Sequence, residues 1–133
     1  MERNLTQGRI SLLADVLRSR QLHSGGWAYF GSEQESIEAT CLGALALGYE
    51  AQANYTAALS FLLKSQLTDG SWPAFLGDSE GNWTTALAVC AMNTTRDFAA
   101  VREKAVRWLD GEQGREGHCP CQRFDGSLTA GHA

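Results

Sequence analysis

The chain has 133 residues, a length that suits one compact domain with a hydrophobic core of its own. Apolar residues make up 44 % and charged residues 20 %, as in ordinary globular proteins. A formal net charge of −4 and the lack of a basic cluster argue against nucleic acid as a partner, because that binding depends on Lys and Arg neutralising phosphates. No apolar run is long enough for a transmembrane segment, and the N-terminus lacks the features of a signal peptide, so we expect a cytoplasmic protein.

The spacing of apolar residues predicts five helices and no sustained strand, hence an all-α fold. The expected helices, in chain order, cover residues 5–20, 36–49, 54–65, 83–92 and 97–110. The first, third and fifth are amphipathic, whereas the second and fourth are apolar on nearly every side. This alternation indicates that the second and fourth helices are sandwiched between the others, as in proteins built from stacked helix pairs.

Local signals support two helix starts and bear on the cysteines. Ser32 and Glu35 have the spacing of a capping box ahead of the second helix, and Asn82 is a suitable N-cap for the fourth. Cys41 and Cys90 fall inside the two apolar helices, so we expect both to be small core residues. A disulfide scaffold is not expected at this size and in this compartment.

One segment of the chain occurs twice, 45 residues apart. The segment Gln21–Trp27 (QLHSGGW) recurs as Gln66–Trp72 (QLTDGSW), and across residues 21–47 the two copies are identical at 9 of 27 positions. Each copy follows an amphipathic helix. A glycine permits a sharp turn at the helix end, and a glutamine amide can hydrogen-bond to free backbone groups there. An indole can pack over the turn and shield it from water.

A third, degenerate copy of the segment begins near the C-terminus. Trp108 and Leu109 match Phe61 and Leu62 at an offset of 47, and Gln113 and Gly117 follow at the same offset from their counterparts in the second copy. No tryptophan completes this copy. The repeat therefore predicts about two and a half helical hairpins.

These residues resemble the QW motif of the prenyltransferase and squalene-oxidase repeat. That repeat builds squalene–hopene cyclases, oxidosqualene cyclases and the β-subunits of protein prenyltransferases. The resemblance covers about residues 10–118 and implies an α/α toroid, a ring of inner helices surrounded by outer helices. We expect a partial toroid in residues 1–118 and an irregular tail in residues 119–133. The motif residues are Gln21, Gly25, Trp27, Gln66, Gly70 and Trp72.

The catalytic groups of these relatives have no clear counterpart in the chain. When Thr85-Ala86 is aligned with the end of the cyclase segment Asp-x-Asp-Asp-Thr-Ala, residues 81–84 read Gly-Asn-Trp-Thr in place of the acids. In the other copy, Glu38 is the only carboxylate in this window. An aspartate-rich magnesium motif is absent and the zinc ligands of prenyltransferases have no convincing match, so we expect no metal and no other cofactor.

We therefore predict a terpenoid-cyclase-like repeat domain without catalytic activity. Its apolar concave face would either bind an isoprenoid or lipid-like ligand, with Trp83, Tyr29, Phe30 and Phe75 lining the site, or pair with another chain as an assembly module. The open ends of the helix array predict a homo-oligomer or association with further toroid repeats. The alternative is an enzyme of the isoprenoid cyclase class, similar to squalene–hopene cyclase, in which Glu38 serves as a divergent proton donor.

Overall fold

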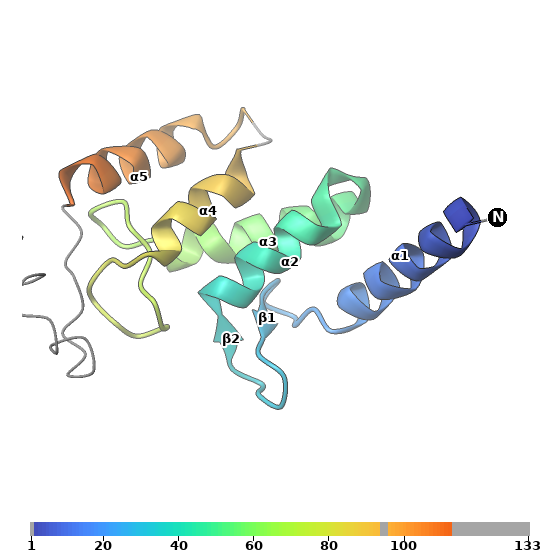
Figure 1. Cartoon of the computed structure of the whole chain (residues 1–133). Coiled ribbons are helices and arrows are strands. Elements are labelled where there is room, and N and C mark those ends of the chain that lie inside the picture. The colour runs from blue at the N-terminus through green and yellow to red at the C-terminus, as the bar shows by residue number, and fades with distance from the viewer. Residues whose placement is uncertain (1, 94–95, 113–133) are drawn as a thin grey trace, which may run out of the picture.

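A computed structural model describes residues 2–93 and 96–112 of the chain (Figure 1). In this part of the chain the fold is helical apart from one short pair of strands, as expected. The helices are α1 (Glu2–Ser19), α2 (Ile37–Leu47), α3 (Gln52–Ser65), α4 (Thr84–Met92) and α5 (Ala99–Gly111). The antiparallel strands β1 (Trp27–Ala28) and β2 (Glu35–Ser36) precede α2, and the 3-10 turn η1 (Gly48–Ala51) joins α2 to α3.

Two helices form the centre of the arrangement. α2 and α4 lie side by side and run in the same direction, while α3 and α5 run in the opposite direction (Figure 1). α3 packs mainly against α2, and α5 packs against α4. We call α2 and α4 the central helices, and α1, α3 and α5 the flanking helices. The expected neighbouring helices at 36–49 and 83–92 are thus present.

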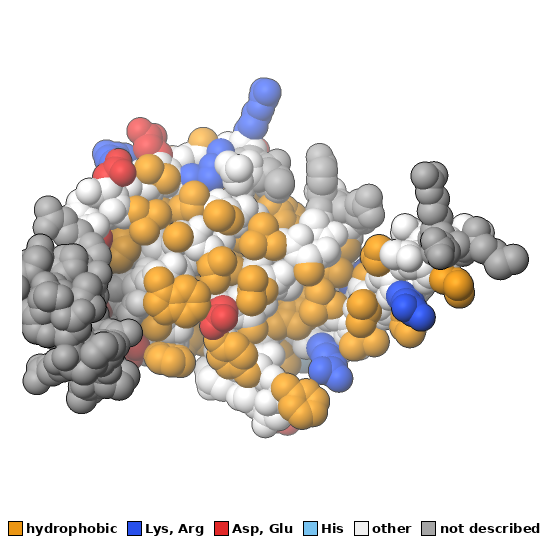
Figure 2. All heavy atoms as spheres, viewed as in Figure 1, with side chains coloured by type: hydrophobic (Ala, Val, Ile, Leu, Met, Phe, Trp, Pro, Cys, Tyr) orange, Lys and Arg blue, Asp and Glu red, His pale blue; other side chains and the backbone are white. Residues whose placement is uncertain are grey.

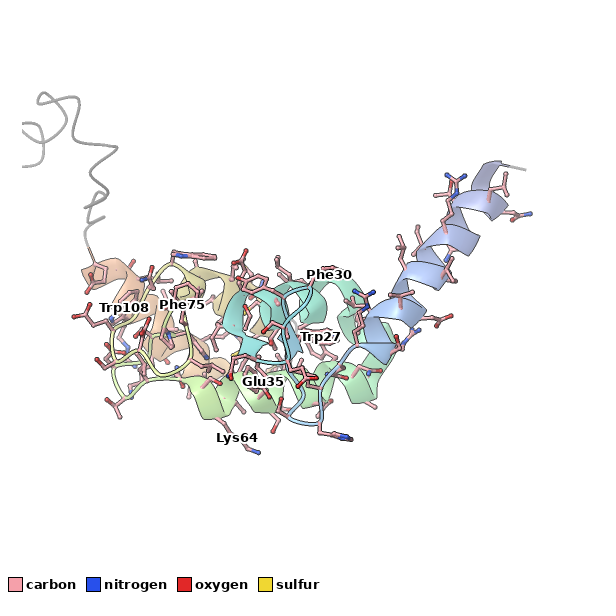
Figure 3. All side chains as sticks on the ribbon, turned by 90° about the horizontal axis from the view of Figure 1, so that it is seen from below. Trp27, Phe30, Glu35, Lys64, Phe75 and Trp108 are labelled. Carbon is pink, nitrogen blue, oxygen red and sulfur yellow. The ribbon has the colours of Figure 1, made fainter. Side chains whose placement is uncertain are left out.

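The first flanking helix is attached differently from the others. α1 projects away from the remaining helices in both ribbon views (Figures 1 and 3). Among its described side chains only Ala14 and Leu17 are half-buried, and both pack against the core. The N-terminal part of α1 therefore has little tertiary support.

The core consists of apolar side chains from the central helices and α3 together with two indoles. Small residues at buried positions of α2, such as Cys41, Gly43 and Ala44, allow its neighbours to approach closely. The largest fully buried side chains, at less than 2 % exposure, are Trp72, Ile37, Leu59, Leu62 and Met92, with several threonines among them.

Helix α2 begins differently from the prediction. Ser36 is its N-cap and accepts a hydrogen bond from the backbone N–H of Ala39 at 3.1 Å, so the expected capping box of Ser32 and Glu35 is wrong. The cause is the β1–β2 pair, which holds Glu35 and Ser36 in an extended conformation until Ile37. The pair has two residues in each strand, too few for a period-two pattern to be visible in the sequence.

The other local expectations have mixed outcomes. The N-cap residue of α4 is Trp83, with no side-chain cap hydrogen bond, so the expected N-cap Asn82 is wrong. The Asn82 side chain accepts a hydrogen bond from Trp83 N at 2.9 Å instead. Cys41 is fully buried as expected, but Cys90 is exposed, because the side of α4 on which it lies is uncovered in the described chain. Two further predictions lie outside the described residues: the degenerate third copy at Gln113 and Gly117, and the irregular tail at 119–133.

Candidate functional site

The two copies of the repeated segment, residues 21–27 and 66–72, fold into the same tight turn. We call each of these turns a corner. In the first, Leu22 N donates to Gly26 O at 2.9 Å, Gly25 N donates to Leu22 O at 2.9 Å, and Gln21 Nε2 donates to Gly25 O at 2.8 Å. The same three bonds in the second copy measure 2.8, 3.0 and 2.9 Å. Gly25 has φ 95° and Gly70 has φ 96°, a conformation that glycine adopts without strain. The repeat found in the sequence is therefore also a repeat of hydrogen-bond geometry.

Each corner ties its indole to the end of the preceding flanking helix. Trp27 Nε1 donates to Leu17 O at 2.8 Å, and Trp72 Nε1 donates to Leu62 O at 2.7 Å. These carbonyls belong to the last turns of α1 and α3, where the regular helical hydrogen bonds run out. Leu17 O also accepts a hydrogen bond from Arg20 N at 3.2 Å. Both indoles are buried.

Each corner is also tied to the central helix that follows it. The backbone N–H of Trp27 donates to Thr40 Oγ1, and that of Trp72 donates to Thr85 Oγ1, both at 2.9 Å. Both threonines are fully buried. The sequence contained a signal for this role, since two identical polar residues stand 45 positions apart inside otherwise apolar helices.

The corner also contacts the next flanking helix. Gln21 Nε2 donates to Asn54 O at 2.9 Å, and Asn54 Nδ2 donates back to Gln21 Oε1 at 2.6 Å. Gly25 packs so closely on α3 that a Cβ atom there would stand 2.1 Å from Ala57 O. In the second copy, Gly70 packs against Lys104 of α5, which is 47 residues after Ala57. The third copy of the repeat is offset by 47 residues and not 45 because two extra residues lie between α3 and α5.

The four predicted ligand-binding residues are all exposed. Trp83 is 53 % exposed, Tyr29 47 %, Phe30 92 % and Phe75 67 %. Hydrophobic side chains gather over the central helices and over the loops that precede them (Figure 2). Phe30 and Phe75, which are 45 residues apart, lie on the same side of the molecule, opposite Lys64 (Figure 3).

The apolar surface continues along the central helices. Leu42 and Leu45, which the sequence analysis did not select, are 48 % and 43 % exposed and follow Glu38 at helical spacing. The residues 45 positions after these three are Trp83, Leu87 and Cys90. We define the apolar face as Tyr29, Phe30, Leu42, Leu45, Phe75 and Trp83. The repeat itself was the signal that could have identified Leu42 and Leu45.

Glu38 lies half-buried beside this face. The Tyr29 hydroxyl donates a hydrogen bond to its carboxylate, and this bond raises the pKa of Tyr29 above its usual value. Glu38 is the only acidic residue of α2, and α4 has none. The arrangement is a single carboxylate held by a phenol at the border of an open apolar surface.

A shallow depression adjoins the face on the side of the β1–β2 loop. The guanidinium of Arg20 lies 5.8 Å from the centre of the Phe30 ring, within the range of a cation–π contact. The depression has a volume of about 270 Å³ and is lined by Arg20, Leu22, Ala28, Tyr29, Phe30, Gly31 and Ser32. Two of the predicted ligand-binding residues therefore line one concave surface, while Glu38 is not among its lining residues.

The placement of side chains bears on metal binding, and the length and character of the helices bear on membrane insertion. Within residues 2–93 and 96–112, no group of three His, Cys, Asp or Glu side chains is placed to hold a metal ion. In the same residues, no helix has both the length and the apolar character needed to cross a membrane.

Comparison with known proteins adds no relative. No protein-family model and no curated protein sequence matches this chain. The corners and the apolar face are therefore the features of the chain that bear on its function.

Proposed function

We propose that this chain is a non-catalytic helical repeat module of the terpenoid-cyclase-like α/α-toroid type, whose apolar face binds an isoprenoid or lipid-like ligand. The observation that carries the proposal is the apolar face, where six large apolar side chains from both repeats are 43–92 % exposed. Contiguous exposed apolar surfaces on a globular protein mark binding sites far more often than isolated exposed residues do.

The geometry of the two repeats supports the same proposal. The stripe Glu38, Leu42, Leu45 on α2 and its counterpart on α4 lie on adjacent helices that run in the same direction. Together they form a surface two helices wide, bordered by the aromatic residues of the preceding loops. Such a surface suits a long, flexible apolar chain, for which burial of CH₂ groups supplies the binding free energy.

Titration of the purified chain with farnesol, followed by tryptophan fluorescence, tests this proposal. We expect saturable binding that weakens at least about tenfold in the double variant Leu42→Ser/Trp83→Phe, because apolar area lost from the site costs about 25 cal/mol per Å². The matched control is Val106→Ser, which alters a side chain of α5 that is 42 % exposed and outside the apolar face. Equal binding by the double variant and the control would refute the proposal.

The second candidate function is an isoprenoid cyclase with Glu38 as its acid. The hydrogen bond between Tyr29 and Glu38 beside an apolar surface favours it. A cyclase must exclude water from its reacting chain in a closed site, whereas Glu38 is half-buried at the border of an open face. Incubation with squalene or farnesyl diphosphate and analysis by gas chromatography distinguishes the two. Our proposal predicts no cyclised product, and a product lost in Glu38→Gln would favour the enzyme.

A further inference from the structure

Two arginines stand at the C-terminal end of α1, and they differ in their surroundings. Arg18 donates a hydrogen bond to Asp15 Oδ1 at 2.7 Å. The exposed side chain of Arg20 forms neither an ion pair nor a hydrogen bond within the described residues. Its guanidinium faces the Phe30 ring, and the N–H groups at the edge of such a guanidinium remain able to donate hydrogen bonds. Arg20 is thus a cation with free donors.

This cation lines the depression beside the β1–β2 loop. Among the residues that line the depression Arg20 is the only charged one, and most of the others are apolar or aromatic: Leu22, Ala28, Tyr29 and Phe30. A charge beside apolar groups attracts an opposite charge more strongly than it does in open water, because the effective dielectric constant is lower there. The depression therefore favours an anionic group of a ligand.

The second repeat keeps the aromatic residue of this site but not its charge. Phe30 corresponds to Phe75, which lies on the same side of the molecule (Figure 3). The residue 45 positions after Arg20 is Ser65, whose hydroxyl donates to a backbone carbonyl of α3 at 2.8 Å. The neighbouring Lys64 lies on the opposite side from both phenylalanines (Figure 3). The site therefore has a charged end in the first repeat and an uncharged counterpart in the second.

The size of the depression determines which part of a ligand it can hold. Its volume of about 270 Å³ is below the range of about 300–1,000 Å³ that is typical of pockets enclosing a whole ligand. The depression has room for a head group and the start of a chain. Tyr29 and Phe30 belong both to the depression and to the apolar face, so the rest of the chain can continue over that face.

The surroundings favour a head group with a single negative charge. Tyr29 donates its hydroxyl hydrogen bond to Glu38, so a carboxylate of the protein lies one side chain away from the depression. A single guanidinium pairs with a ligand carboxylate through two parallel N–H···O bonds. A phosphate or diphosphate brings further negative charge, which one arginine near a glutamate does not compensate. No group of side chains in residues 2–93 and 96–112 is placed to add a metal ion.

We propose that the ligand of the apolar face is a long-chain carboxylate whose head group is bound by Arg20 in the depression. Its chain runs from there over α2 towards Trp83 and Phe75, where the second repeat offers apolar side chains and no counterpart of Arg20. This inference rests on the proposed function and adds the chemical class of the ligand and the direction in which it lies.

Titrations with laurate and with dodecanol, followed by tryptophan fluorescence, test the proposal, because the two compounds share a chain length and differ in charge. We expect laurate to bind at least about tenfold more tightly than dodecanol, since a hydrogen bond to a charged group is worth about 1.5–3 kcal/mol. In Arg20→Gln the two should bind equally, with the affinity for dodecanol unchanged. Arg20→Lys should keep part of the preference, because lysine retains the charge but not the paired donors. The matched control is Arg18→Gln, which alters an arginine outside the depression and should keep the full preference.

Three results would overturn the head-group assignment. They are equal affinities for laurate and dodecanol in the unaltered chain, a preference for laurate that survives in Arg20→Gln, and tighter binding of dodecyl phosphate than of laurate. In each of these cases, saturable binding of farnesol leaves the proposed function standing. If none of the compounds binds, farnesol included, the proposed function fails and this inference fails with it.

Discussion

At the scale of single residues, glycine sets the distance between a corner and the next helix. Alanine at position 25 would combine a φ of 95° with a Cβ only 2.1 Å from Ala57 O. Gly31 also has positive φ, 80°, but open space around its Cα, so it serves as the control for backbone strain alone.

We predict that Gly31→Ala lowers the free energy of unfolding by about 1–2 kcal/mol through strain, and Gly25→Ala by about 3 kcal/mol or more through strain and displacement of α3. Urea denaturation of both variants measures the difference. Equal losses would show that the close approach of the corner to α3 is unimportant for stability.

The two described cysteines should differ in reactivity. Burial raises the pKa of the Cys41 thiol to about 12, with smaller contributions from Cys90 and Glu38, whereas Cys90 is exposed. Because the thiolate is the nucleophile, iodoacetamide should modify Cys90 in the folded protein and Cys41 only after unfolding. Peptide mapping separates these sites from Cys119 and Cys121. Modification of Cys41 at the same rate as Cys90 under native conditions would contradict the fold.

The raised pKa of Cys41 makes the free energy of unfolding depend on pH. Above the ordinary thiol pKa of 9.0 the unfolded chain loses the Cys41 proton while the folded chain keeps it, up to about pH 12. The contribution of Cys41 to stability is therefore present below pH 9 and falls as the pH rises through this window. Cys41→Ala removes this contribution.

At the scale of elements, buried threonines connect each corner to its central helix. In Thr40→Val or Thr85→Val the shape is nearly kept, but the backbone N–H of Trp27 or Trp72 loses its acceptor. An unpaired buried donor costs about 1–3 kcal/mol, so we expect each variant to lose that much unfolding free energy. Thr56→Val, on the exposed surface of α3, is the matched control and should be nearly neutral. A neutral Thr40→Val would mean that the corner relaxes onto another acceptor.

The elements themselves were largely predictable from the sequence. Apolar periodicity located all five helices of the described chain, and the 45-residue repeat located both corners. The β1–β2 pair is not predictable in this way, because strands of two residues show no alternation. Since this pair keeps Glu35 and Ser36 extended, α2 is capped by Ser36 and not by Ser32.

The candidate site was predictable only in part. The sequence predicts Trp83, Tyr29, Phe30 and Phe75 as ligand-binding residues, and the structure places all four at the surface. The sequence does not reveal that Leu42, Leu45 and Cys90 are exposed. A helix that is apolar on all sides gives no indication of which side is left uncovered. That information lies in the number of neighbouring helices, and a sequence pattern within one helix does not contain it.

At the scale of the whole molecule, the two corners occupy different positions in the array. Trp27 joins α1, which contacts the rest through α2, whereas Trp72 joins α3, which lies against both central helices. In a stack whose stability is the sum of nearest-neighbour interfaces, a weakened terminal interface frees only the terminal element. A weakened internal interface affects the whole stack.

Trp27→Phe and Trp72→Phe should therefore have different consequences even though each removes one equivalent hydrogen bond to a helix-end carbonyl. We predict that Trp27→Phe accelerates amide exchange in α1 and leaves α3, α4 and α5 nearly unchanged. Trp72→Phe should accelerate exchange in all described helices and lower the global unfolding free energy by about 1 kcal/mol for the hydrogen bond, plus a cavity contribution. Trp83→Phe, at an exposed indole, controls for the change of side chain. If Trp27→Phe loosened every helix to the same extent as Trp72→Phe, the described chain would be a single cooperative core, and α1 would not behave as a terminal element of the stack.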